Sequence, residues 1–499
     1  MNFGRRFFAT ILAVAIVTAS MLTGVVDTSG IQANRAQDQA MTPVEVDPVP
    51  GDAIRVCQDC EANDLQATID AAPEGAVIVV EGGSWPPLSI IKPVRLVGQQ
   101  WPLIDAKDEG TGITIAANDV SIEGFDIRNS GRSFDKEDSG IYFEGERTKV
   151  LNNRLTEILF GVNGATGHDS VIAGNYIEGQ TGISEGLRGD GIKVWYSHRV
   201  QIYNNHVTKS RDLLVWYSNE SRVYANLVTD SRYGFHFMNS DDGEAAGNQM
   251  VNNSVGIYIM YGKRFTIKDN LLQNSRGPSG HGIGLKEVDG FEVTGNVIYN
   301  NRIGIYNDNS PFSMNTYGIF HDNLIAYNDS GIGVLPSARA NIYYQNSFVE
   351  NLEHVVVLGE GALSEQNTWS QNGLGNYWSD YTGYDADADG IGDLPFRSAA
   401  MTEQLRRSHP QLQLFRFSLA ETAVDFAAEA MPLFKTDALL EDAYPLVKPV
   451  LPQNAPDVWQ ENTINRTSVV SISLIVGVAA SMWWATKPVR AASKQMEAA

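Results

Sequence analysis

The 499-residue sequence is poor in basic residues, and it contains only two cysteines. Lysine and arginine total 37 against 59 aspartates and glutamates, so the formal net charge is -22. An acidic surface repels the phosphate backbone of a nucleic acid, and we therefore expect no nucleic-acid partner. Glycine is abundant, at 46 residues, and recurs beside short β-branched runs. This pattern disfavours a helical bundle and favours short strands joined by tight turns.

The two cysteines, Cys57 and Cys60, enclose the short phrase Cys-Gln-Asp-Cys. No histidine follows Cys60, which excludes the attachment pattern of a c-type haem. In an exported protein a local disulfide is the first interpretation. Soft-metal binding or redox chemistry is the alternative, and the pair alone does not decide between them.

The N-terminus predicts export, and both ends of the chain agree on its topology. Residues 1–26 place two arginines before an apolar run and predict a signal peptide or an N-terminal anchor, and residues 27–54 follow as a spacer. Residues 467–485 are almost uncharged and apolar and predict a transmembrane helix. Cations in residues 486–499 predict a cytoplasmic tail. We therefore expect a periplasmic or other extracytoplasmic body, anchored in the membrane by its C-terminal helix.

A repeated phrase, an asparagine followed by apolar residues, a polar turn and a glycine, indicates the fold. Each repeat has too few apolar residues to bury them alone, so repeats must stack as coils with the asparagines in a ladder at one bend. The repeat phrase of leucine-rich proteins is absent. We therefore predict an all-β, right-handed parallel β-helix over residues 55–378. Successive asparagines of the phrase lie 21 to 30 residues apart, at Asn153, Asn175, Asn205, Asn226, Asn248, Asn270, Asn296, Asn323 and Asn346.

The ends of this solenoid also have sequence signals. Residues 65–72 predict a short amphipathic helix, and the runs 76–80 and 94–97 predict the first strands. The asparagine rhythm ends after Trp378, and residues 398–466 predict a helical or irregular segment. Within the solenoid, longer steps predict loop insertions after Asn175, Asn270 and Asn296.

Four coils align without gaps at one strand, which allows side chains to be sorted by alternation. Trp195, Trp216, Met238 and Met260 then form one outward column, with His236 on the same side. A solvent-facing apolar column marks a partner surface, and thioethers beside an imidazole also suit Cu(I). A third interpretation is that a loop or the C-terminal segment covers the column.

Residues 379–397 hold an alternating run of carboxylates with a glycine where a cation-binding loop must turn. Phe396 stands where an EF-hand would place its bidentate glutamate, so that family is excluded. A structural calcium loop is the functional interpretation, and an acidic surface turn is the alternative. The candidate ligands are Asp385, Asp387, Asp389 and Asp393.

Parallel β-helices often cleave acidic polysaccharides. Asp241, Asp242 and His281 resemble the paired aspartates and Gly-His-Gly of polygalacturonases. However, Asp242 falls in a turn about two coils away from His281, and the Arg-x-Lys signature of that family is missing. We therefore expect no enzymatic activity and assign no catalytic residue.

Several phrases along residues 60–450 are similar to those of one family. They are the cap phrase at residues 65–73, Tyr-Gly-Phe-His-Phe-Met-Asn-Ser at residues 233–240, Gly-Asn-Tyr-Trp-Ser-Asp at residues 375–380, and Pro-Leu-Val-Lys-Pro at residues 445–449. With these phrases the sequence resembles the NosD family, the extracytoplasmic β-helix accessory proteins of nitrous oxide reductase maturation.

The resemblance implies work beside an ABC-type permease and ATPase, and help in delivering copper to nitrous oxide reductase, with copper bound transiently. The predicted C-terminal membrane helix departs from the family pattern. The alternative is a carbohydrate-binding or polysaccharide-processing β-helix surface protein that uses Trp195 and Trp216 as sugar platforms.

Overall fold

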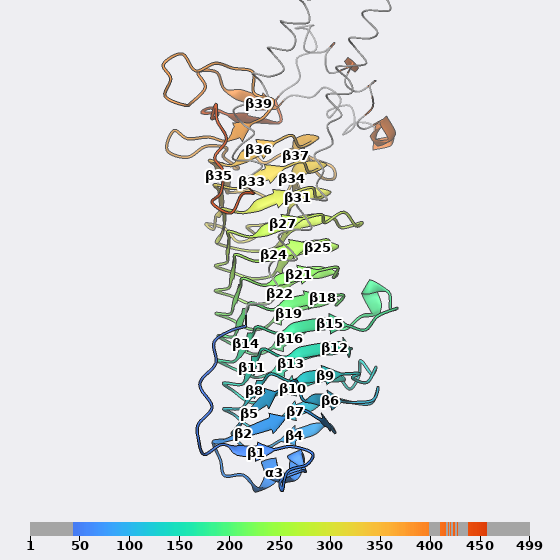
Figure 1. The fold of residues 1–499 in the computed structure, drawn as a ribbon. Coiled ribbons are helices and arrows are strands. Elements are labelled where there is room, and N and C mark those ends of the chain that lie inside the picture. The colour runs from blue at the N-terminus through green and yellow to red at the C-terminus, as the bar shows by residue number, and fades with distance from the viewer. Residues whose placement is uncertain are drawn as a thin grey trace, which may run out of the picture. The chain divides into compact units, whose positions relative to one another are not determined.

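The computed structural model describes residues 43–398 and 438–456, together with residues 410–415, 418, 420, 423, 424 and 427. Residues 54–378 form a stack of β-coils (Figure 1). Each coil contributes one short strand to each of three parallel sheets, which we call sheets A, B and C. The predicted parallel β-helix is therefore confirmed.

The bounds of the strands in the three sheets follow in stacking order. Sheet A consists of β1 (Ile54–Val56), β2 (Ala76–Glu81), β5 (Val94–Gln99), β8 (Ser121–Glu123), β11 (Lys149–Leu151), β14 (Val171–Ala173), β17 (Gln201–Tyr203), β20 (Arg222–Tyr224), β23 (Glu244–Ala246), β26 (Thr266–Lys268), β29 (Phe291–Thr294), β32 (Gly318–His321) and β35 (Asn341–Tyr344). Sheet B consists of β3 (Ser84–Trp85), β6 (Leu103–Asp105), β9 (Asp126–Arg128), β12 (Arg154–Ile158), β15 (Tyr176–Gly179), β18 (His206–Thr208), β21 (Leu227–Thr229), β24 (Gln249–Val251), β27 (Leu271–Gln273), β30 (Val297–Tyr299), β33 (Leu324–Ala326), β36 (Ser347–Val349) and β38 (Tyr377–Trp378). Sheet C consists of β4 (Leu88–Ile90), β7 (Ile113–Ile115), β10 (Ser139–Phe143), β13 (Phe160–Ala165), β16 (Ile192–Trp195), β19 (Asp212–Trp216), β22 (Tyr233–Met238), β25 (Val255–Met260), β28 (His281–Lys286), β31 (Ile303–Asp308), β34 (Ser330–Val334) and β37 (Glu353–Val357).

The inward side chains of neighbouring coils stack into continuous columns. On sheet C, Phe235 pairs with Ile257 of the next coil, which in turn pairs with Ile283. All three side chains are fully buried. Because burying an aliphatic or aromatic side chain stabilises the fold by about 1.5–3 kcal/mol, a coil gains most of its stability from its neighbours.

The predicted asparagine ladder is confirmed at the bend between sheets A and B. At each step the side-chain oxygen of one asparagine accepts the backbone N–H of the asparagine one coil earlier, as Asn226 does from Asn205 over 3.0 Å. The ladder continues one residue further than expected, to Asn376. It ends on the buried carboxylate of Asp442, which accepts the N–H of Asn376 over 2.7 Å.

A second ladder occupies the bend between sheets B and C, and the sequence did not predict it. Asn301, Asn328 and Asn351 repeat the same hydrogen bonds. Lower in the stack the side-chain oxygen of Asn253 accepts the N–H of Ser231 in the same way.

The predicted insertions are present: the 3-10 helix η1 (Glu185–Leu187) lies between β15 and β16, and longer loops separate β27 from β28 and β31 from β32.

Each end of the stack is closed (Figure 1). The predicted N-terminal helix is confirmed as α3 (Leu65–Ala71), capped by Asp64, with Leu65 and Ile69 buried against the first coils. At the other end β39 (Phe396–Ser398) pairs antiparallel with β40 (Leu440–Asp442). Phe396 stacks on the fully buried Trp378, whose indole N–H donates to Asp442 over 2.9 Å.

The predicted signal segment 1–26, transmembrane helix 467–485 and tail 486–499 lie outside the described residues. Within the part of the chain that the structure describes, no helix has the length and apolar character needed to cross a membrane. A further 3-10 helix, η2 (Pro410–Phe415), precedes β40.

Candidate functional site

The outward column predicted on sheet C is present. Trp195 pairs with Trp216, Trp216 with Met238, and Met238 with Met260, on strands β16, β19, β22 and β25. We call these four residues the Trp–Met column. Because neighbouring strands are about 4.8 Å apart, the two methionine side chains start from adjacent backbones and point to the same side.

The Trp–Met column is less exposed than the sequence suggested. Trp195 keeps 39% of its surface exposed, whereas Trp216, Met238 and Met260 are half-buried. The residue after each member of the column has a positive φ, so the chain turns there, and Tyr196 at one of these turns is exposed. Tyr196 packs against Trp195, and Tyr217 packs against Trp216, so these two tyrosines cover part of the column.

Two exposed tyrosines extend this apolar surface. Tyr196 stacks on Tyr217 with ring centroids 5.0 Å apart, and Trp195 packs edge-on against Tyr196. Trp216 in turn stacks on Tyr217. The four rings form a continuous aromatic surface at one end of the column, of the kind that marks interfaces.

His236 lies on the same side of β22 as Met238 but is only 8% exposed. It is therefore covered rather than solvent-facing, because the rings of Tyr233 and Tyr258 pack against its imidazole. Its Nδ1 lies 3.1 Å from Oδ2 of Asp212. Its Nε2 is buried without a hydrogen-bond partner.

Sequence reasoning missed the buried charges beneath this histidine. Asp212 is 1% exposed, and Arg232 holds it through a bond from Nε to Oδ1 of 2.8 Å. Burial alone would raise the pKa of the Asp212 carboxyl, but hydrogen bonds from His236 and Arg232 outweigh it and lower that pKa. Asp190 and Arg211 repeat the ion pair one coil earlier. The sequence does contain a signal for these two ion pairs, because an arginine follows each aspartate at a distance of about one coil.

These residues have the donor types that Cu(I) prefers. Two thioethers are soft ligands, and a neutral imidazole nitrogen is a borderline one. The unpartnered Nε2 of His236 is the orphaned polar atom that a bound ion would satisfy. The chemistry of the donor set therefore fits a copper ion.

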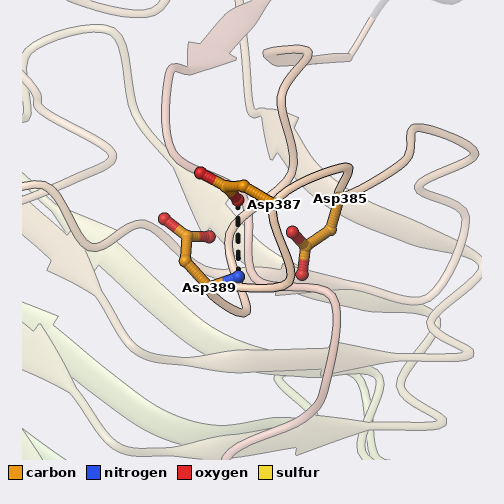
Figure 2. Close-up of side chains that lie close together, drawn as sticks. All are labelled: Asp385, Asp387 and Asp389. Atoms are coloured by element: carbon orange, nitrogen blue, oxygen red, sulfur yellow. Dashed lines mark hydrogen bonds between the residues drawn. The ribbon is translucent and has the colours of Figure 1, made fainter.

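The structure brings together three of the four predicted calcium ligands. Carboxylate oxygens of Asp385, Asp387 and Asp389 lie within 4.8 Å of one another. Figure 2 shows them on one turn, where the N–H of Asp389 donates to Asp387. Asp393 instead accepts the N–H of Ala386 over 2.7 Å. Oδ1 of Asp385 is buried without a partner, which fits a cation ligand.

The remaining candidates are placed as follows. Cys57 and Cys60 form a disulfide just after β1. Asp242 forms an ion pair with Arg264, and Oδ1 of Asp241 accepts the N–H of Lys263. The paired aspartates are thus bound to the equivalent turn of the next coil. His281 lies two strands from β22, with its ring stacked on Tyr306.

Comparison with known proteins gives one family. The family model described as "Periplasmic copper-binding protein (NosD)" matches residues 173–383, a span that includes the Trp–Met column. A probable ABC transporter binding protein NosD of Stutzerimonas stutzeri is 28% identical over 387 residues, covering 72% of this chain and 84% of the relative. The counterpart from Pseudomonas aeruginosa is 26% identical over 386 residues, covering 72% and 85%. The predicted resemblance is confirmed.

A solved structure supports the fold. The catalytic unit of a thermostable alpha-1,3-glucanase from Streptomyces thermodiastaticus matches with a TM-score of 0.52, at 16% identity, over 69% of this chain and 72% of that one. At this identity the likeness concerns the fold alone.

Proposed function

We propose that this NosD-like chain is an extracytoplasmic accessory protein that binds Cu(I) transiently and passes it on for the maturation of nitrous oxide reductase. The observation that supports this most is the register of Met238 with Met260, beside the unpartnered Nε2 of His236. The family model describes periplasmic copper-binding proteins. We assign the chain no catalytic step of its own.

The ligand geometry suits a cargo ion. Methionine is unbranched and flexible, so the two thioethers can converge on one ion although their backbones are a strand apart. Aromatic rings on one side and the half-buried column limit the access of water. Three ligands hold Cu(I) without enclosing it, which leaves a side open for transfer to a partner.

We further propose that the aromatic surface of Trp195, Tyr196, Trp216 and Tyr217 docks a partner protein. Aromatic side chains are enriched in the centres of protein interfaces, and this surface adjoins the methionines. The curated relatives are named ABC transporter binding proteins, which supports an ABC-type permease and ATPase as the partner.

Two further roles complete the proposal. The apolar sequence of residues 467–485 supports a membrane anchor, which would keep the solenoid beside its membrane partner. The aspartate loop supports a structural Ca²⁺ ion, with Asp385, Asp387 and Asp389 as ligands. Here the ion would neutralise carboxylates that otherwise repel one another.

The function is tested in a bacterium that depends on this chain to mature nitrous oxide reductase. The double variant Met238→Leu/Met260→Leu keeps the apolar volume, so we expect the chain to fold while the copper content of the purified reductase falls. Met314→Leu is the matched control, because this methionine is 82% exposed and lies outside the column. Full copper loading with the double variant would contradict the proposal.

A second candidate function is carbohydrate binding, favoured by the exposed Trp195 and the Tyr196–Tyr217 stack. Sugars stack on such rings and do not need thioethers. Under this alternative, Trp195→Ala/Tyr217→Ala would abolish glycan binding measured by calorimetry, and Met238→Leu/Met260→Leu would leave it unchanged.

A further inference from the structure

We infer that Asp212 is a positioning residue of the copper site, because its contact with His236 leaves Nε2 of that imidazole as the metal-facing nitrogen. The inference rests on the proposed function, since it assumes that His236 faces the ion. It adds a residue that neither the sequence pattern nor the outward column identifies. Asp212 begins β19, one coil before His236.

The contact between the two side chains fixes which nitrogen carries the proton. Oδ2 of Asp212 lies 3.1 Å from Nδ1 of His236, and an ionised carboxylate can only accept a hydrogen bond. Nδ1 must therefore carry the hydrogen. In a neutral imidazole the other nitrogen, Nε2, then bears the lone pair.

Arg232 keeps the carboxylate in place. Its Nε donates to Oδ1 of Asp212 over 2.8 Å, and its Nη2 donates to Oδ2, so both oxygens are held. The guanidinium also lies over the ring of Tyr233, 4.5 Å from the centroid, and this ring packs against His236. The imidazole is thus held by the Asp212 carboxylate at Nδ1 and by the ring of Tyr233, which stands at a right angle to it.

The free nitrogen is the second observation. His236 is more than nine-tenths buried, and its Nε2 has no hydrogen-bond partner. Leaving a buried acceptor unpaired costs free energy, which a bound ion would recover. Histidines that bind metals usually donate their other N–H to a carboxylate, and this is the arrangement found here.

His236 is distinctive among the histidines that the structure describes. His168 and His198 accept backbone N–H groups at Nδ1, and His321 contacts carboxylates at both nitrogens. His281 has an unpartnered Nδ1 but no carboxylate contact among the described residues. Within this described set, His236 combines a carboxylate on one nitrogen with a buried, unpartnered second nitrogen.

The first test is Cu(I) binding by the full-length chain, measured by competition with a chromophoric Cu(I) chelator. Asp212→Asn is expected to weaken Cu(I) binding about 10–100-fold, the usual effect of losing such a contact. The matched control is Asp190→Asn, which loses an equivalent buried ion pair with Arg211 but has no histidine contact. This control should bind Cu(I) as the parent does.

X-ray absorption of the same samples reports the ligands directly. We expect sulfur scattering to persist in Asp212→Asn while the nitrogen contribution is lost or disordered. Unchanged affinity and unchanged nitrogen scattering would overturn the role of Asp212 alone. Parent protein that binds no Cu(I) would overturn the proposed function as well, so the two failures are distinguishable.

A measurement on the parent protein serves if Asp212→Asn does not fold. Two-bond ¹⁵N–¹H spectra distinguish the two neutral tautomers of a histidine, and His236→Gln assigns the signal. We expect the Nδ1–H tautomer before copper is added and a shift of Nε2 on addition of Cu(I). Observation of the Nε2–H tautomer would overturn the inference.

Discussion

The side-chain amide of Asn248 donates to the side-chain oxygen of Asn270, one coil further along, over 2.9 Å. The backbone N–H of Asn248 donates to the same oxygen, also over 2.9 Å. Its amide also donates to the carbonyl of Val223 over 2.9 Å. One buried side chain therefore bonds to the coil before its own and to the coil after it, and the ladder joins consecutive coils of the solenoid.

The first prediction concerns this ladder. Asn248→Ala leaves the N–H of Asn226 buried without its acceptor and removes one hydrogen bond to the carbonyl of Val223. An unsatisfied buried group costs about 1–3 kcal/mol, so we expect the free energy of unfolding to fall by at least about 1 kcal/mol. Urea denaturation measures it, with the exposed Asn63→Ala as control. Equal midpoints for the two variants would show that the ladder does not stabilise the fold.

The fold followed from the sequence because its period is visible. The ladder asparagines are identical in type, and each must occupy the same bend, so their spacing indicates the coil length. The second ladder was missed because Ser231 and Ser275 stand where asparagines would continue it. A mixed column of serine and asparagine gives no single repeated letter.

The site could be predicted only in part. Gapless alignment gives strand register, and register placed Met238 opposite Met260. Alternation tells on which side of a strand a residue lies, but it does not tell what covers the residue. The burial of His236 depends on Asp212 and Tyr258 from the two neighbouring coils, and such contacts have no signature in the local sequence.

The second prediction is a dependence of stability on pH. Burial lowers the pKa of His281 to about 4, with a smaller effect from the charge of Arg302. The unfolded chain has a histidine pKa of about 6.5. Below that pH the unfolded state takes up a proton that the folded state does not, so stability is lost as pH falls.

His281→Phe keeps a ring to stack on Tyr306 and removes the titration. The parent should lose stability relative to this variant by up to about 1.4 kcal/mol per pH unit between about pH 6.5 and 4. Above pH 7 the difference between the two proteins should be constant. Urea denaturation at several pH values measures it, and parallel profiles throughout would contradict the burial of a neutral His281.

The third prediction concerns the aspartate loop, which is bound to the C-terminal closure of the stack. The N–H of Gly392 donates to the carbonyl of Pro445 over 2.7 Å, and Val447 donates to Gly390. Excess Ca²⁺ should therefore raise Tm relative to a chelator, and Asp387→Asn should remove this difference. Asp135→Asn, an exposed aspartate elsewhere, should not. A Tm that is independent of calcium would identify the loop as an acidic turn.

The most direct test of the copper site is X-ray absorption of the full-length chain loaded with one equivalent of Cu(I). The account predicts scattering from two sulfurs and one nitrogen, from Met238, Met260 and His236. Met238→Leu/Met260→Leu should lose the sulfur signal and bind Cu(I) more weakly, whereas Met314→Leu should match the parent. A parent spectrum without sulfur, or an unchanged spectrum in the double variant, would contradict the assignment of the Trp–Met column as the copper site.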